Sequence, residues 1–301
     1  MILKTRKNYN SNILYISILQ MSASVVFKGN AGNHMFQYFT AVAFCVKNNI
    51  NMNTKPTKKM LTSVKINEKI FCLNTSNKKI TKKKKFTFRN FDKNNELLFA
   101  GDDFEYVFKD FFQNAEYLNN HYDNIIKYVT PISYDCSSYL LNYKSIQTND
   151  ILFIIRLGDF IHQGKNSEIV HPQYFLDILN KHSFDSIYFL IHPVKDPYIT
   201  KYMNYFDAYK NKIIVLDNRN ELIDFNIVRY FKNIAITNST FNWWSCFFDK
   251  QLETKTLFTS QKIGYCGIGD KFKCHGAHIQ NLQNIRNISI PIDHEFINLK
   301  I

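Results

Sequence analysis

Apolar residues in the second half of the chain form short runs that alternate with amphipathic stretches. Residues 151–155 form an unbroken apolar run, which is typical of a strand buried on both faces of a sheet. Similar runs predict strands at residues 186–192, 212–217, 234–238 and 254–261. Helical patterns lie between them at residues 171–182, 220–233 and 239–251. This alternation predicts the α/β class, with a parallel, doubly wound sheet.

The first half shows the same alternation less clearly. Val25 to Phe27 predicts a short strand, a glycine turn follows, and Met35 to Val46 suits a mostly buried helix. Residues 50–95 are polar and predict loops with short strands, whereas residues 104–129 begin with aromatic residues and continue in a helical pattern. We therefore predict two Rossmann-like domains and a tail. Their predicted bounds are residues 22–148, 149–270 and 271–301.

Composition favours a folded protein with a large core. The 301 residues are 45% apolar and 16% aromatic, which excludes a mainly disordered chain. The net charge of +13 is uneven, because residues 1–150 hold 21 Lys and Arg against 11 Asp and Glu, and residues 151–301 hold 17 against 14. Much of the excess lies in residues 77–89, NKKITKKKKFTFR, which suit a solvated loop or a weak contact with an anionic surface. Its lysines are clumped rather than interleaved with aromatics, so no nucleic-acid partner is expected.

Cysteine usage and the N-terminus exclude two further classes. Six cysteines in a chain of this length do not make a disulfide scaffold. A cluster near the C-terminus offers zinc-type ligands, but its spacing fits no standard zinc site, and no metal is expected. It consists of Cys266, Cys274, His275 and His278. The N-terminal apolar patch is interrupted by polar residues and is shorter than a spanning helix, which predicts a soluble, cytoplasmic protein, with membrane association as the alternative.

Three stretches lie where predicted strands end, which is where open α/β sheets bind ligands. The first is GNAGNHMFQYFTA, residues 29–41. Gly29 and Gly32 permit a tight turn with exposed amides at a helix N-terminus, although a plain strand-to-helix turn explains them as well. The stretch lacks both G-x-G-x-x-G and the lysine of a P-loop, so a dinucleotide or ATP site is not indicated.

The second stretch, IIRLGDF, places Arg156 at the end of a buried strand. A buried guanidinium needs an anion, which is either a bound diphosphate or Asp159 within the protein. The third, IAITNSTFNWWSCFF, contains a polar turn before a helix, whose side chains either cap the helix or bind phosphate oxygens. The turn consists of Asn238, Ser239 and Thr240. The two tryptophans after it are expected in the core rather than in a sugar platform.

Together these stretches resemble the motifs of glycosyltransferase family 11, the α-1,2-fucosyltransferases. GNAGNHMFQYFTA is similar to that family's G-x-x-G-N-Q-(M/L)-F-Q-Y-A, IIRLGDF to its H-x-R-R-G-D-Y, and TNSTFNWWSCFF to its N-S-(S/T)-F-S-W-W. Two shorter stretches, FFQNAEY and HPQYF, are similar to family segments that lie between them. The order agrees, and the resemblance spans residues 25–260.

The resemblance implies a GT-B fold, in which two Rossmann-like domains face a central cleft. It implies GDP-β-L-fucose as the donor, a glycan acceptor, inversion at the sugar and no metal. Arg156 and Asp159 match the arginine and aspartate of the second motif, and Arg156 would bind the diphosphate. Asp224 matches a carboxylate that would accept the guanine N1–H and N2–H. Residues 238–240 match the phosphate turn, and Gly29, Gly32 and Asn33 match the glycine loop of the first domain.

Several positions depart from the family pattern. The family histidine is Ile154 here, its second arginine is Leu157, and the glutamine of the first motif is His34. Asp159 and His34 are both candidates for the general base. Three alternatives therefore stay open: a transferase with another nucleotide-sugar donor, a catalytically lapsed homologue that binds GDP, and a lectin-like or nucleic-acid-binding protein.

Overall fold

The computed structural model describes most of the chain. The described residues are 21–73, 84–92, 94, 96–101, 104–157, 169–191, 198–237, 239–249, 254–260 and 286–290. Five predictions fall outside them and stay predictions. These are the interpretation of the N-terminal apolar patch within residues 1–20, the roles of Asp159 and Asn238, the zinc-type cluster at 266–278 and residues 77–83 of the lysine-rich segment.

The first half of the chain builds a parallel sheet with the strand order β2-β1-β5-β4. Its strands are β1 (Ser22–Val25), β2 (Asn51–Met52), β4 (Lys84–Phe88) and β5 (Phe104–Phe108). Helix α1 (Ala31–Asn48) makes the crossover from β1 to β2. The other elements are α2 (Lys58–Leu61), η1 (Glu68–Cys72), α3 (Ala115–Asn120), α4 (Tyr122–Ile126) and an antiparallel pair of β3 (Val64–Ile66) and β6 (Val129–Pro131).

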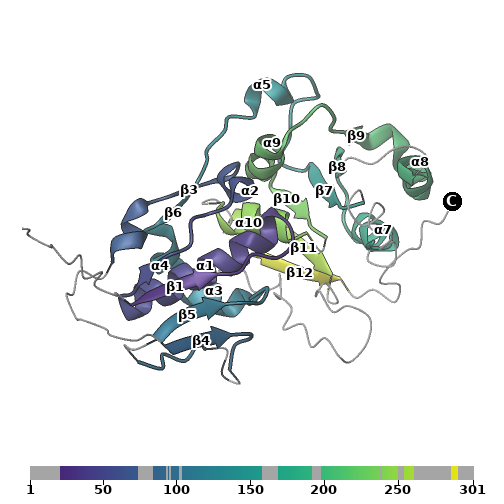
Figure 1. The fold of residues 1–301 in the computed structure, drawn as a ribbon. Coiled ribbons are helices and arrows are strands. Elements are labelled where there is room, and N and C mark those ends of the chain that lie inside the picture. Colours follow the sequence, from purple (N-terminus) through teal and green to yellow (C-terminus); the bar gives the residue numbers. More distant parts are fainter. Residues whose placement is uncertain are drawn as a thin grey trace, which may run out of the picture.

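The second half builds a larger parallel sheet with the order β12-β11-β10-β7-β8-β9 (Figure 1). Its strands are β7 (Ile151–Ile155), β8 (Ile187–Ile191), β9 (Ile213–Val215), β10 (Asn233–Ala235), β11 (Thr256–Ser260) and β12 (Arg286–Ile290). The helices are α5 (Ser137–Leu140), α7 (Gln173–Lys181), α8 (Tyr198–Met203), η3 (Asn204–Lys212), α9 (Glu221–Asn226), η4 (Ile227–Tyr230) and α10 (Thr240–Phe247). The predicted α/β class with parallel sheets is confirmed.

Four predicted elements differ from the structure. Strand β1 ends at Val25, because Ser22–Val25 are the residues that pair with the neighbouring strands β2 and β5. Val26 is exposed. Helix α1 begins at Ala31, so the second glycine of the opening stretch lies inside its first turn. The aromatic entry at 104–108 is strand β5, and residues 286–290 of the predicted tail form strand β12 beside β11.

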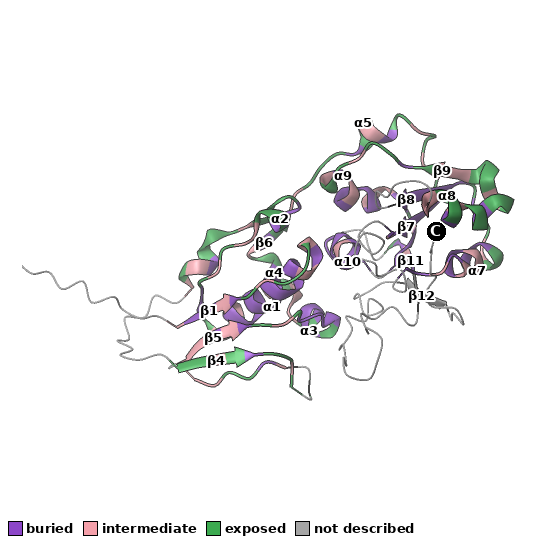
Figure 2. Cartoon of the chain, turned by 45° about the vertical axis from the view of Figure 1, so that its right-hand side comes forward, coloured by how far each residue is buried: buried purple, intermediate pink, exposed green. Residues whose placement is uncertain are grey.

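Strand β7 joins two hydrophobic clusters, as its unbroken apolar run predicted. All five of its residues are buried, and they alternate between the two faces of the sheet. Ile151, Phe153 and Ile155 pack in a cluster with α7, whereas Leu152 and Ile154 belong to a cluster that continues into the first half of the chain. Figure 2 shows buried residues running through α1, α10 and the strands of the second sheet. The two halves therefore share one continuous core.

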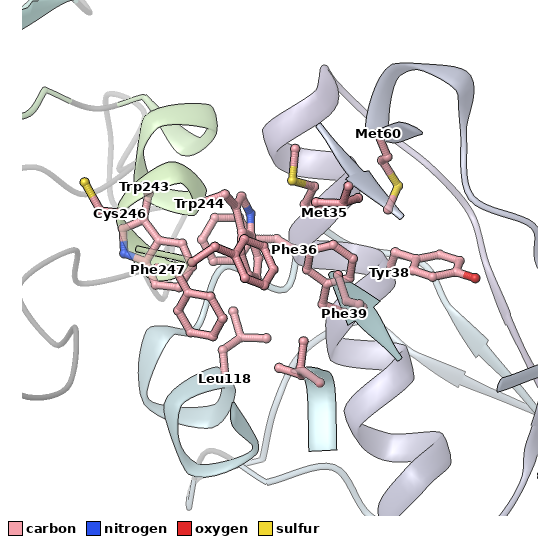
Figure 3. Packing of buried hydrophobic residues seen from close by; sticks show 14 of the residues in the cluster. Met35, Phe36, Tyr38, Phe39, Met60, Leu118, Trp243, Trp244, Cys246 and Phe247 are labelled. Carbon is pink, nitrogen blue, oxygen red and sulfur yellow. The ribbon is translucent and has the colours of Figure 1, made fainter. Parts of the chain in front are cut away.

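The contact between the halves is an aromatic layer between α1 and α10. Phe36 lies 4.8 Å from both Trp243 and Trp244, measured between ring centroids, and Phe39 lies 4.8 Å from Trp244 (Figure 3). Both tryptophans are fully buried, which confirms that they belong to the core. Burying rings of this size contributes about 1.5–3 kcal/mol each to the free energy of unfolding. This layer fixes the first turns of the two helices next to each other.

Candidate functional site

The three stretches singled out from the sequence meet at one pocket of about 310 Å³ between the two halves of the chain. Arg156 reaches it from the end of β7, Gly32 from the first turn of α1, and Ser239 and Thr240 from the start of α10. Asp224 of α9 also lines it. The pocket lies at the carboxyl ends of the strands of the second sheet, where parallel sheets bind ligands, and its volume suits a small ligand.

Gly32 lies in close contact with the start of α10 in the other half. A Cβ atom at this position would lie 2.4 Å from the Phe241 backbone nitrogen and 2.4 Å from Thr240 Oγ1. The Trp244 indole Nε1 donates a hydrogen bond to the Gly32 carbonyl oxygen at 3.1 Å. The backbone of this glycine therefore comes close to the polar turn of the other half. Its small size serves the packing of α1 on α10, which also forms one wall of the pocket.

The described lining of the pocket holds three basic and two acidic side chains. Lys59, Arg156 and Arg219 line it together with the carboxylates of Glu221 and Asp224. The first residues of α1 and α10 line it as well, so both helices direct the positive ends of their dipoles to the same space. Because Arg219 is paired with Asp224, the groups that suit an anionic ligand such as a diphosphate are Lys59, Arg156 and the two helix N-termini.

Asp224 is held by an arginine that none of the sequence motifs includes. Arg219 Nε donates to Asp224 Oδ1 at 2.5 Å, and both side chains are largely buried. The other guanidinium nitrogens donate to the carbonyl oxygens of Ile191 and Leu216. Asp224 thus lines the pocket, where the sequence placed it, with an ion-pair partner beside it.

The polar turn at the start of α10 caps the helix. Ser239 is its N-cap residue, and Ser239 Oγ accepts a hydrogen bond from the Asn242 backbone N–H at 3.3 Å. Capping was one of the two interpretations of the sequence at this serine, and the structure shows it. Ser239 and Thr240 nevertheless line the pocket, so the amides of this first turn stay next to any ligand there.

Gly29, Asn33 and His34 of the opening stretch were predicted as site residues, but they are not among the described residues that line the pocket. Gly29 has a φ of 82°, and the Asn33 side chain occupies the space that a Cβ at Gly29 would take. Gln113 Nε2 donates to Asn33 Oδ1 at 2.8 Å, which links the FFQNAEY stretch to the opening one. His34 Nδ1 lies 3.0 Å from Thr57 Oγ1. These residues shape the first turn of α1, whose start lines the pocket.

His34 should make the stability of the protein sensitive to acid. Burial and the charge of Lys59 lower the pKa of His34, despite a hydrogen bond with the Gly29 backbone that raises it. The folded state therefore prefers the neutral ring, and stability falls as the pH drops below the unfolded value of about 6.5. We expect His34→Gln to lose less stability than the wild type between pH 7 and pH 5 in urea denaturation. Equal losses would mean that His34 does not titrate differently in the two states.

Sequence reasoning missed two other basic residues that line the pocket with Arg156, namely Lys59 and Arg219. Lys59 lies in a polar region without clear periodicity, and its Nζ contacts Asn30 Oδ1 at 3.3 Å. Arg219 follows β9 at the carboxyl end of the sheet, so the strand-end rule that found Arg156 could have found it too. Glu221 accepts a hydrogen bond from Thr62 of the first half at 3.1 Å, and only the folded chain brings these residues together.

The described part of the chain gives no sign of a metal centre or a membrane span. No three of its His, Cys, Asp or Glu side chains are grouped so that they could hold a metal ion. None of its helices has both the length and the apolar surface that a bilayer crossing requires. Cys45, Cys72, Cys136 and Cys246 are free thiols.

Parallel sheets with a pocket at their carboxyl ends define an α/β protein that is compatible with a Rossmann-like glycosyltransferase. Comparison with known proteins agrees with this class. The chain is 22% identical over 242 residues to an α-1,2-colitosyltransferase of Escherichia coli, with 72% of this chain and 83% of that protein covered. No family model matches the chain. The chain is therefore a distant homologue of a glycosyltransferase.

Proposed function

We propose that this protein is an inverting, metal-independent fucosyltransferase that moves L-fucose from GDP-β-L-fucose to a hydroxyl of a glycan, most simply the 2-hydroxyl of a galactose-like sugar. The observation that carries the proposal is the meeting of three fucosyltransferase-like stretches at one cationic pocket. The homology to a glycosyltransferase that forms an α-1,2 linkage supports the same reaction class. The two parallel sheets on either side of the pocket would correspond to the two domains of a GT-B fold.

The chemistry would be a single in-line displacement. The acceptor hydroxyl attacks C1 of fucose, the bond from C1 to the β-phosphate oxygen breaks, and GDP leaves with the electron pair. Arg156 and the first turn of α10 stabilise the charge that develops on the leaving diphosphate. Lys59 adds positive charge around it, which is the role that a divalent metal has in other transferases.

The proton of the acceptor hydroxyl passes to a general base, for which Asp159 and His34 are the candidates. The lowered pKa of His34 keeps its ring neutral near pH 7, as a base requires, but its Nδ1 already contacts Thr57. A transfer assay on His34→Gln separates the two candidates. Retained turnover in this variant would remove His34 and leave Asp159.

A second donor has support from the comparison. The relative is named for colitosyl transfer, and colitose is fucose without its 3-hydroxyl group. GDP-colitose is therefore the alternative donor, and the same pocket would hold its GDP part. Parallel transfer assays with GDP-fucose and GDP-colitose on galactose-terminated acceptors, with the linkage read by NMR, decide between them.

Selective stabilisation by GDP is the first expected result. A ligand that binds only the folded state at 100 times its Kd stabilises a protein by about 2.7 kcal/mol, so the melting temperature should rise with GDP. UDP and ADP should give a much smaller rise at the same concentration. Thermal shift with the three nucleotides in EDTA measures base selectivity and whether nucleotide binding requires a metal. Equal shifts for all three, or none, would contradict a GDP-sugar donor.

A further inference from the structure

Arg219 links three parts of the second half that are separate in sequence. It lies between β9 and α9, directly after Asn218, which has a φ of 47°. Its guanidinium donates to the carbonyl oxygens of Ile191 and Leu216 and, through Nε, to Asp224 Oδ1. Ile191 is the last residue of β8, and Leu216 follows β9. The arginine therefore ties a side chain of α9 to the ends of two strands.

The surroundings of this arginine hold it in one orientation. Its side chain is only 7% exposed, and that of Asp224 is 19% exposed. Three nitrogens of one planar group donate to three fixed oxygens, a pattern that the single ammonium of a lysine does not reproduce. Both Arg219 and Asp224 line the pocket. A ligand that contacts Asp224 thus meets a carboxylate whose orientation is set by Arg219.

Orientation decides what an aspartate can recognise. The guanine N1–H and N2–H are parallel donors on one edge, and a carboxylate accepts both only when its plane faces that edge. The terminal torsion of an aspartate is broad, so a partner has to select this orientation. A carboxylate has about four acceptor positions, which allows Asp224 to accept from Arg219 and from a base together.

We propose that Arg219 is a positioning residue for base recognition, which orients Asp224 so that the pocket selects guanine nucleotides. The proposal rests on the proposed function, in which Asp224 reads the guanine of a GDP-sugar. It adds that selectivity for guanine depends on Arg219, whose Nε donates a hydrogen bond to Asp224. Affinity for the diphosphate is assigned instead to Arg156 and the start of α10.

Inosine diphosphate gives a direct test, because it differs from GDP only in lacking the 2-amino group. Dissociation constants for GDP, inosine diphosphate and pyrophosphate are measured by calorimetry on the wild type and on Arg219→Met, Asp224→Asn and the double variant. The wild type should prefer GDP over inosine diphosphate by about tenfold or more, as expected for a hydrogen bond to a charged group. Arg219→Met should bring this preference close to one and leave pyrophosphate affinity unchanged.

The double variant shows whether Arg219 acts through Asp224. If it does, adding Arg219→Met to Asp224→Asn changes the preference no further, because the two residues act as a unit. If Arg219→Met does not fold, Arg219→Lys, which keeps the charge, replaces it in the test. Its preference for GDP over inosine diphosphate should lie between that of the wild type and one. Circular dichroism checks the fold of each variant.

Two outcomes would overturn the proposal, and they are distinguishable. If Arg219→Met or Arg219→Lys weakens GDP and inosine diphosphate equally, or changes neither, Arg219 has only a structural role and the proposed function is unaffected. If the wild type binds GDP and inosine diphosphate equally, Asp224 does not read the 2-amino group and the positioning role fails. The proposed function itself fails at the donor only if the wild type does not bind GDP.

Discussion

Replacing Arg156 with alanine should lower kcat for sugar transfer by about 10²–10³-fold, as loss of a single preorganised donor at a developing negative charge does. Arg156 lies at the end of β7 and lines the pocket where the three fucosyltransferase-like stretches meet. Its charge interacts more strongly with the diphosphate as the bond to C1 breaks, so the loss falls on kcat as well as on donor affinity. Single-turnover transfer from radiolabelled GDP-fucose measures it.

Two controls separate this effect from loss of structure. Arg229→Ala removes an arginine of the same half from η4, outside the described pocket lining, and should leave transfer near the wild-type rate. Arg156→Lys keeps a charge without the planar fork, and its rate should fall between those of the wild type and the alanine variant. Wild-type turnover in a folded Arg156→Ala variant would place the diphosphate elsewhere.

Replacing Gly32 with alanine should destabilise the whole chain by about 3 kcal/mol, the upper part of the range for overpacked cores. The added Cβ would lie 2.4 Å from the Phe241 nitrogen and 2.6 Å from the Thr240 carbonyl carbon. These are backbone atoms of α10, which carries the buried Trp243 and Trp244, so relief requires a shift of the aromatic layer. The melting temperature should fall by roughly 5 °C.

The direction of the change in melting temperature shows which effect is larger at position 32: the clash with α10 or the preference of alanine for a helix. Alanine favours a helix over glycine by about 1 kcal/mol, so Gly32→Ala would stabilise α1 if the two halves did not touch there. A melting temperature at or above that of the wild type would therefore contradict the contact. Gly101→Ala separates steric clash from backbone strain, since its Cβ would meet nothing within 4 Å. Any fall in its melting temperature comes from the backbone strain of a φ of 120° alone.

The position of the site was predictable because parallel sheets bind ligands at the carboxyl ends of their strands. Strands were predicted at residues 151–155 and 234–238, and parallel strands place the residues that follow them at one edge. This rule alone predicts that Arg156 and Ser239 lie near each other. The same rule applied to β9 would have added Arg219.

The roles of individual residues were less predictable. Ser239 capping and phosphate binding are equally compatible with the sequence, and only the hydrogen bond to Asn242 shows that capping occurs. Strand β5 was interpreted as an aromatic entry to a helical stretch, although its sequence, FEYVF, places an aromatic residue at every second position, as a half-buried strand does. Its pairing with β1 and β4 defines it as a strand.

By itself, the sequence determined the α/β class, the buried strands of the second sheet and the stretches that carry the candidate chemistry. These features can be predicted because each depends on a pattern of residues that are close together in the sequence. The tertiary structure decided that Gly32 meets the start of α10, and that Arg219 holds Asp224. Gly32 and Trp244 are 212 residues apart in the sequence, and they come into contact only when the whole core packs. The residues around either position therefore do not predict this contact.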